Sequence, residues 1–246
     1  STIASNMADG SYTAVFTIAT PPTQTFVSTE SDTPAFFCAV SAPTAAGILT
    51  DMDKPDKNAT GTSNAIPVSK IIDLAQATTP VKKIGLIYSG NEDNATNTVK
   101  QCEEYLKSIN VEYVEKTAAS SNDVETATNA LIAEGAEAIF VPNDSIIQDG
   151  VSKLTEICNE KKIPTYCSSA TTVASGCFAT LAIDDKGIGK KTVDIAMDYV
   201  NGKEVADIPA QVVGIDYCSV NKSAMKTLGI SQDHIKTDYK LNVIEN

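Results

Sequence analysis

Small polar residues directly follow four apolar segments of this chain, and they are of types that bind ligands rather than attack them. The segments are KIGLIY (83–88), AIFV (138–141), PTYC (164–167) and FATLAI (178–183). The polar residues that follow them, and that we predict to bind a ligand, are Ser89, Asn91, Asn143, Asp144, Ser168, Ser169 and Asp184. In open parallel α/β sheets, ligands bind at the carboxyl ends of the strands, where helix N-termini present free N–H groups. Hydroxyls, amides and carboxylates at these positions favour holding a small polar molecule over transforming it.

Asp144 is the strongest single candidate. It follows a buried-type strand in the turn Pro142-Asn143-Asp144-Ser145. A carboxylate there can accept charge-assisted hydrogen bonds from the α-ammonium group of an amino acid. The alternative interpretation is an ordinary helix N-cap, a position that favours Asp and Asn. The same alternative applies to Asp184, which precedes a predicted helix, and one turn can serve both uses.

Two further strand-like segments, AVFTIA (14–19) and AFFCAV (35–40), end at Thr20 and Ser41. All 19 basic residues of the chain are lysines, so no guanidinium group is available to clamp a carboxylate. We therefore expect a ligand carboxylate to bind to these hydroxyls and to backbone N–H groups near Ala42, because helix N-termini carry a partial positive charge. Turn and capping chemistry alone is the alternative interpretation.

The chain lacks the sequence patterns of catalytic sites. It contains no G-x-S-x-G, H-E-x-x-H or G-x-G-x-x-G motif, and His234 is its single histidine. The six cysteines show no C-x-x-C spacing and are predicted to be free core thiols. The sequence therefore predicts no enzyme, no cofactor and no metal site. The net charge of −12 also argues against a nucleic-acid partner, which would require a basic surface.

The spacing of the predicted elements indicates an α/β fold. Strand-like segments begin near residues 84, 111, 138 and 164, and helix-period segments follow at about 93–109, 122–134, 145–161 and 186–201. This βαβ order predicts parallel sheets with right-handed crossovers. In the first 80 residues we predict a helix at 67–77 and a polar surface loop at 51–64, and we predict a final helix within 220–230.

We therefore predict two Rossmann-like lobes with parallel sheets, joined by a hinge. The first comprises residues 1–80 plus about 185–203, and the second 81–184 plus about 204–246. Thr78-Thr79-Pro80 is a predicted hinge, since proline restricts the preceding residue. Clefts between lobes favour small ligands, and closure would sequester them. The opening STIASNMADG indicates a helix end and a turn, so we expect the first lobe to be truncated at its N-terminus.

Several segments in order along the chain resemble one known family. They are IATPPTQ, FCAVSAPTAAGI, KIGLIYSGNEDNA, AIFVPNDS, KIPTYCSS and FATLAIDDKGIGKKTVDIAMDYVNGKEVADIP. Together they resemble substrate-binding proteins of ABC transporters, in the tryptophan- or tyrosine-associated branch with the type I periplasmic-binding-protein fold. The position of Asp144 resembles an acidic residue of that family. The family has a further βαβ-like segment ahead of the position of Ser1.

The resemblance implies a monomeric extracytoplasmic lipoprotein or periplasmic protein that binds a small ligand. The ligand would be an amino acid, possibly an aromatic one, passed unchanged to a membrane permease. One alternative is a ligand-sensing domain of a receptor or transcriptional regulator with the same two-lobe fold. A third class, an α/β enzyme, would need a catalytic constellation that this sequence lacks.

Overall fold

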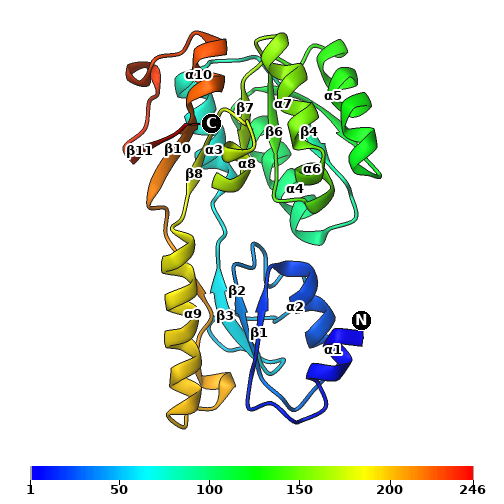
Figure 1. Cartoon of the computed structure of the whole chain (residues 1–246), viewed down its shortest axis with the longest axis vertical. Helices are drawn as coiled ribbons and strands as arrows, with labels where there is room; N and C mark the ends of the chain where they lie inside the picture. The colour runs from blue at the N-terminus through cyan, green and yellow to red at the C-terminus, as the bar shows by residue number, and fades with distance from the viewer. Residues whose placement is uncertain (1, 246) are drawn as a thin grey trace. The chain divides into compact units, whose positions relative to one another are not determined.

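The computed structural model describes residues 2–245, and these residues form two compact units. Unit 1 consists of the chain up to Ala65 together with Ile183–Gly214, and unit 2 of Ile66–Ala182 together with the chain from Ile215 onward. Figure 1 labels most of the elements of both units. Among the described residues, no helix combines the length and the apolar character that crossing a membrane requires.

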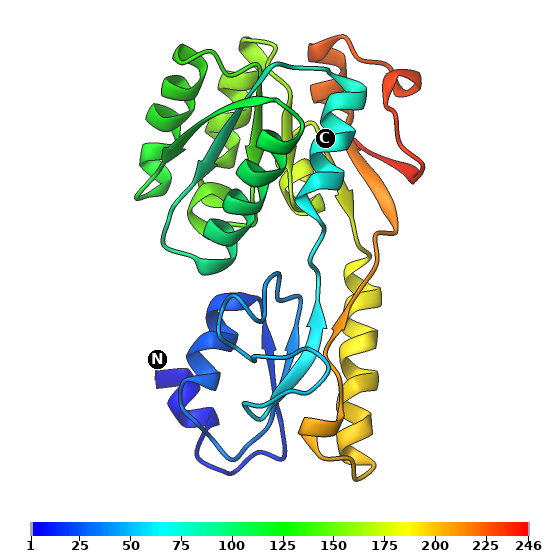
Figure 2. The ribbon, with the colours of Figure 1, turned by 180° about the vertical axis from the view of Figure 1, so that it is seen from behind.

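Unit 1 is built around a parallel sheet with the strand order β1-β2-β3-β9. Helices α1 and α2 cover one face, where Phe26 and Phe37 are buried, and α9 packs on the other face against Phe36. Figure 2 shows β3, in cyan, running beside α9. The elements are α1 (Thr2–Met7), β1 (Val15–Ile18), α2 (Thr20–Val27), β2 (Ala35–Cys38), β3 (Ala59–Ser63), α9 (Asp185–Val200), η2 (Val205–Asp207) and β9 (Gln211–Val212).

Unit 2 has a larger sheet with the strand order β11-β10-β8-β7-β6-β4-β5. Its strands are β4 (Lys83–Tyr88), β5 (Glu112–Thr117), β6 (Ala138–Val141), β7 (Thr165–Cys167), β8 (Ala179–Ala182), β10 (Tyr217–Asn221) and β11 (Lys240–Ile244). Its helices are α3 (Val68–Thr78), α4 (Asp93–Ser108), η1 (Ser121–Asp123), α5 (Val124–Ala133), α6 (Ser145–Asp149), α7 (Val151–Glu160), α8 (Ala170–Ala174), α10 (Lys222–Leu228) and η3 (Gln232–His234). These bounds lie close to the predicted ones for most elements.

Both faces of the unit 2 sheet are buried, as expected for a mostly parallel sheet. In β6, Phe140 faces the cluster that contains α3, α4 and α10, whereas Ile139 and Val141 face the cluster that contains α5 and α7. This alternation explains why the strand is apolar at every position, because each face is covered by helices.

The prediction of a surface loop at 51–64 was wrong for its last part, because β3 is a fully buried strand. Its polar side chains are satisfied inside unit 1: the Thr60 hydroxyl donates to the Ile208 carbonyl over 2.7 Å, and the Thr62 and Thr192 hydroxyls lie 2.6 Å apart. Gly61 pairs with Phe37, and a Cβ atom at Gly61 would lie 1.9 Å from the Phe37 carbonyl oxygen. The segment Ala59–Ser63 therefore has a composition typical of a loop but forms a strand, and the backbone of β2 lies close to it.

Two other differences concern single elements. The helix predicted at 145–161 is divided into α6 and α7 at Gly150, where a Cβ atom would lie 2.6 Å from Val124 Cγ2. The sheet of unit 2 also contains one antiparallel pair, β8 with β10. The chain leaves unit 2 after Ala182 and returns at Ile215, so β10 begins beside the end of β8 and runs back along it.

The boundaries of the two units differ from those predicted for the lobes. The predicted lobes begin at residue 1 and end at residue 246, which lie outside the described residues. Helix α3 was assigned to the first lobe but belongs to unit 2, where Ile71 and Ile72 enter the core. The predicted hinge also lies in unit 2, because the Thr79 hydroxyl is 2.7 Å from the Tyr166 hydroxyl. Residues 205–212 belong to unit 1, where β9 pairs with β3.

Candidate functional site

Unit 2 brings six of the predicted ligand-binding residues to one end of its sheet. Strands β4, β6 and β7 are parallel neighbours, so the residues after them emerge at the same edge. These residues are Ser89 and Asn91 after β4, Asn143 and Asp144 after β6, and Ser168 and Ser169 after β7. The spacing of the strands in the sequence therefore predicted that these six residues lie at one edge of the sheet; that they bind a ligand stays a prediction.

Asp144 is buried at the centre of the cluster, with 1% of its surface exposed. One carboxylate oxygen, Oδ1, accepts from the Ile147 backbone N–H at 3.1 Å and caps α6. The other oxygen, Oδ2, accepts from the backbone N–H and from the hydroxyl of Ser89, both at 2.8 Å. The carboxylate thus caps a helix and ties the loop after β4 to the loop after β6. Contact with a ligand ammonium group stays a prediction.

Asn94 belongs to the same cluster, and the sequence analysis missed it. It lies in the first turn of α4 with 4% of its surface exposed, and its side-chain amide donates to the Asn143 carbonyl at 2.7 Å. Its Oδ1 atom is buried and has no hydrogen-bond partner among the described residues. The sequence did offer one signal for this residue, because Asn94 comes shortly after the polar residues that follow β4.

The serines and Asn91 form the outer part of this cluster. Ser169 caps α8 by accepting from the Thr171 N–H at 3.2 Å, and the Ser168 N–H donates to the Val141 carbonyl at 3.0 Å. Both serines are half-buried, whereas Asn91 is exposed, and its N–H donates to the Ser89 hydroxyl at 3.2 Å. The polar groups at this edge are consequently fixed by capping and turn contacts.

Unit 1 places Thr20, Ser41 and Ala42 at the carboxyl ends of the neighbouring strands β1 and β2. Thr20 is buried at the start of α2, and the half-buried Ser41 hydroxyl donates to Asn64 Oδ1 at 3.2 Å. The Ala42 carbonyl accepts from the Ala46 N–H at 2.9 Å. Asn64 follows β3 and was missed because that segment was predicted to be a loop.

The backbone at these two strand ends adopts conformations that are unfavourable for alanine. Ala19 follows β1 with φ 69° and ψ 168°, and Ala39 follows β2 with φ 56°. Residues held in such regions cost free energy and cluster at ligand-binding sites. The surrounding hydrogen bonds hold Ala19 in place, since its N–H donates to the Cys38 carbonyl at 3.0 Å and its carbonyl lies 2.7 Å from the Thr23 hydroxyl.

Asp184 lies at the start of α9 in unit 1 and is exposed. Its Oδ2 atom accepts from the Gly187 N–H at 3.0 Å, so the capping role considered for this residue is present. The contribution of Asp184 to ligand binding stays a prediction.

The chemistry available to these residues is hydrogen bonding and charge. Within residues 2–245, no group of three or more His, Cys, Asp and Glu side chains is arranged to hold a metal ion. All six cysteines are free, and burial raises the pKa of the Cys102 and Cys218 thiols to about 12. These two thiols therefore remain protonated at neutral pH, and the protonated form is a poor nucleophile.

The family model described as "ABC transporter substrate binding protein" matches residues 1–237. The chain belongs to this family. A tyrosine-binding protein of Clostridioides difficile is 32% identical over 238 residues, which are 95% of this chain and 69% of that protein.

Solved structures agree with this assignment. An ABC domain from Streptococcus pneumonia in complex with L-Trp is matched with a TM-score of 0.89 and 28% identity, over 99% of this chain and 82% of that one. A conserved domain protein from Vibrio cholerae is matched with a TM-score of 0.89 and 29% identity, over 98% and 82% of the two chains. The predicted family and the periplasmic-binding-protein-like α/β fold are confirmed.

This substrate-binding protein is therefore the solute-binding component of an ABC transporter, and its family is extracytoplasmic. The family assignment favours this function over the alternative of a sensing domain in a receptor or transcriptional regulator.

Proposed function

We propose that this substrate-binding protein binds an aromatic amino acid, tyrosine or tryptophan, and passes it unchanged to an ABC permease. The observation that supports this ligand class most directly is that relatives named for tyrosine and tryptophan match nearly the whole chain. We propose further that the protein is a monomer, held outside the cytoplasm by a lipid anchor or free in a periplasm.

In this proposal each unit offers its own chemical groups to an amino acid. In unit 2 the Asp144 carboxylate, together with Ser89 and Ser168, suits an α-ammonium group. In unit 1 the hydroxyls and backbone N–H groups at the ends of β1 and β2, near Thr20, Ser41 and Ala42, suit a carboxylate, since the chain has no arginine. The strained backbone at Ala19 supports this assignment, because strain of this kind is retained where a ligand must be met by fixed N–H groups.

Thermal denaturation in the presence of single solutes tests the ligand class. A solute at about 100 times its Kd stabilises the folded state by about 2.7 kcal/mol, which raises the Tm of a protein of this size by about 5–10 °C. We expect this rise with L-tyrosine or L-tryptophan and a smaller one with L-leucine. No rise with either aromatic amino acid, together with a rise for a sugar or a purine, would refute the proposal.

The role of Asp144 is tested with a ligand that lacks the amine. The variant Asp144→Asn keeps a side-chain oxygen that can cap α6 but removes the charge. We expect it to weaken binding of the amino acid by about 10- to 100-fold, the loss of one charge-assisted hydrogen bond. The deamino analogue of the same ligand, an arylpropionate, should bind to both proteins equally. Equal losses for the two ligands would assign Asp144 a structural role only.

The absence of chemistry is tested on the bound ligand itself. Mass spectrometry of the ligand recovered after prolonged incubation with the protein should return the mass that was added. A new product that forms in proportion to protein concentration would show that the chain is an enzyme.

A further inference from the structure

Two side-chain atoms within residues 2–245 are buried and have no hydrogen-bond partner, Asn94 Oδ1 and Ser219 Oγ. A buried polar atom without a partner costs free energy, so folded proteins contain few of them. Ser219 lies inside the sheet of unit 2, in β10, opposite Thr180 of β8 and Asn242 of β11. Asn94 instead lies at the edge where the polar residues after β4 and β6 meet. The two atoms therefore have different surroundings, and only that of Asn94 adjoins predicted ligand-binding residues.

The side chain of Asn94 is fixed by the turn that carries Asp144. Its amide donates to the Asn143 carbonyl at 2.7 Å, and only 4% of its surface is exposed. The Oδ1 atom cannot rotate toward another donor without breaking this hydrogen bond. Asn143 directly precedes Asp144, whose carboxylate accepts from Ser89 in the loop after β4. An unsatisfied acceptor is thus held in place beside the predicted ammonium-binding carboxylate.

Donors in the adjoining loops already serve other acceptors. The backbone N–H and the hydroxyl of Ser89 both donate to Asp144 Oδ2 at 2.8 Å. The Asn91 N–H donates to the Ser89 hydroxyl at 3.2 Å, and the Ser145 N–H donates to Glu92 Oε1 at 3.0 Å. A donor for Asn94 Oδ1 is therefore one that a ligand or solvent supplies.

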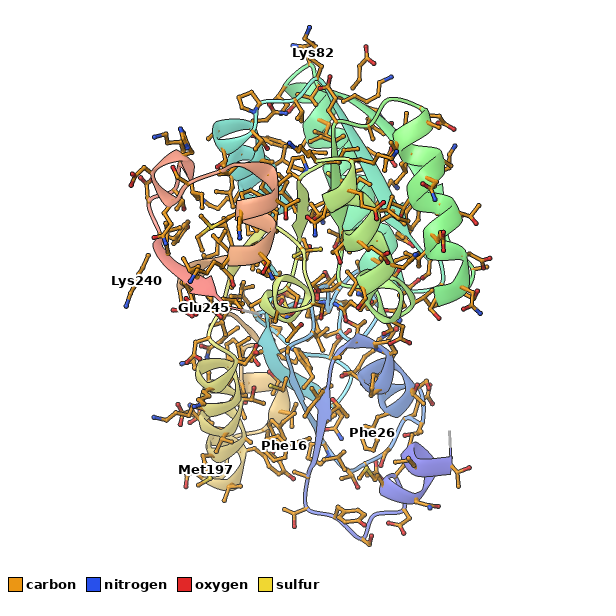
Figure 3. All side chains as sticks on the ribbon, turned by 45° about the horizontal axis from the view of Figure 1, so that its top comes forward. Phe16, Phe26, Lys82, Met197, Lys240 and Glu245 are labelled. Carbon is orange, nitrogen blue, oxygen red and sulfur yellow. The ribbon has the colours of Figure 1, made fainter. Side chains whose placement is uncertain are left out.

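The charges at this edge favour a cationic donor. Between the end of β4 and Asn94, and in the turn after β6, the chain has no lysine and three carboxylates, those of Glu92, Asp93 and Asp144. Lysine lies at the opposite end of the same strands: Lys82 precedes β4, and Figure 3 shows its side chain pointing outward at that end of unit 2. A cationic donor gains from nearby carboxylates, whereas a neutral donor does not.

We propose that Asn94 Oδ1 is a second acceptor for the α-ammonium group of the ligand, beside the Asp144 carboxylate. This inference rests on the proposed function, the binding of an amino acid. An ammonium group has three N–H donors, and a carboxylate that already accepts three hydrogen bonds has about one lone pair left for it. Asn94 takes a second N–H. A solute without an amine leaves Oδ1 unsatisfied, so Asn94 selects amino acids over the corresponding carboxylic acids.

A ligand reaches Asn94 only if the adjoining loop shifts, because the Oδ1 atom is buried. Gly90 in this loop has φ 75°, and a Cβ atom there would meet Thr117 Cγ2 only at 3.9 Å, so the loop is loosely packed at this point. Two hydrogen bonds from Ser89 to Asp144 tie the loop to the turn after β6. A ligand ammonium group competes for the same carboxylate and thereby releases the loop.

Two substitutions at Asn94 separate the acceptor from the hydrogen bond to Asn143. Asn94→Asp keeps an oxygen acceptor and loses the amide donor, whereas Asn94→Leu loses both. Calorimetry gives the ratio of the affinities for L-tyrosine and for its deamino analogue, 3-(4-hydroxyphenyl)propionate. We expect this ratio to be kept or raised in Asn94→Asp and to fall about tenfold in Asn94→Leu, the loss of one hydrogen bond to a charged group. A ratio that Asn94→Leu leaves unchanged would overturn the inference, whatever the stability of the variant.

The matched control is Ser219→Ala, which removes the other unsatisfied atom in the interior of the sheet. It should leave the affinity ratio unchanged. A fall as large as that in Asn94→Leu would show that the ratio responds to any change in the core of unit 2, and the inference would be overturned.

Crystal structures of the unmodified chain with and without the amino acid provide a readout that needs no substitution. The ammonium nitrogen should lie about 2.7–3.2 Å from Asn94 Oδ1. A water molecule that satisfies Oδ1 and stays there when the amino acid is bound would overturn the inference. If neither L-tyrosine nor L-tryptophan binds, the proposed function fails, and the affinity ratio is measured with the amine-bearing solute that raises the Tm most. If no amine-bearing solute binds, both fail.

Discussion

The strand ends of unit 2 are organised by a buried carboxylate, whereas those of unit 1 are organised by hydroxyls and a strained backbone. Asp144 accepts three hydrogen bonds at the ends of β4 and β6. At the ends of β1 and β2, Thr20 and Ser41 are neutral, and the one carboxylate of the predicted set that lies in unit 1, Asp184, caps α9 in solvent. The same α/β construction therefore holds its strand ends with a buried carboxylate in one unit and with neutral groups in the other.

Removing the buried carboxylate of Asp144 is expected to change stability more than any other substitution discussed here, and it tests the contrast between the two units. Asp144→Ala leaves the Ser89 and Ile147 N–H groups buried without an acceptor, so we expect the free energy of unfolding to fall by about 3 kcal/mol. Urea denaturation measures this change. Glu104→Ala on the exposed surface of α4 is the control, with an expected change below about 0.5 kcal/mol. A similarly small change for Asp144→Ala would show that the carboxylate does not hold the loops after β4 and β6 together.

Alkaline pH should test the buried thiols of unit 2. Burial raises the pKa of Cys102 and Cys218 in unit 2 to about 12, from the ordinary 9.0. Well below pH 9 these thiols are protonated in both the folded and the unfolded state. As the pH rises toward 12, the unfolded chain loses protons that the folded chain keeps, so stability falls, by about 1 kcal/mol per thiol at pH 10.

The measurement is the unfolding free energy between about pH 8 and 10. We expect a shallower decline for Cys218→Ala than for the unmodified chain. Identical slopes for the two proteins would refute the thiol origin of the decline.

A smaller effect should follow from the exposed carboxylate of unit 1. Asp184→Ala removes the acceptor for the Gly187 N–H at the start of α9, and we expect a loss of about 1 kcal/mol, typical of an N-cap. Asp184→Asn retains a capping oxygen and should lose only a fraction of this. A loss as large as that of Asp144→Ala would break the contrast between a buried and an exposed carboxylate.

The smallest effect is expected at the hydroxyl that joins β2 to β3. Ser41→Ala removes one half-buried hydrogen bond to Asn64, and we expect about 0.5 kcal/mol of lost stability. Thr44→Ala, at an exposed position of the same loop, should show no change. If Ser41→Ala destabilised the protein as strongly as Asp144→Ala, the strand ends of unit 1 would depend on a buried polar network as those of unit 2 do.

Much of the fold could be predicted because helix and strand periods are local properties. The bounds of β4 and β6 agree with the predicted strands, and α4, α5 and α9 begin and end within a few residues of the predicted helices. The prediction failed where a distant segment decides the structure. The sequence of β3 is typical of a loop, and its strand structure depends on the close approach of Phe37 to Gly61. The break at Gly150 depends on contact with Val124.

The candidate site was predictable in the same partial way. A polar residue after a buried strand is visible in the sequence, so the members of the unit 2 cluster could be named. Their pairing could not, because Ser89 and Asp144 are separated by 55 residues and meet only through the sheet. Asn94 was missed because it lies in the first turn of a helix and not directly after a strand, and Asn64 was missed because β3 was predicted to be a loop.

By itself, the sequence determined where most of the strands and helices lie, which polar types end the strands, and that none of these 246 residues is an arginine that could take part in binding. Only the tertiary structure decided that Asp144 is buried and satisfied and that β3 lies inside a sheet. It also decided that Asn94 Oδ1 is buried without a partner among the described residues. The physical reason is that periodicity reports which side of an element is apolar, whereas burial and hydrogen-bond partners depend on what packs against it, often more than a hundred residues away.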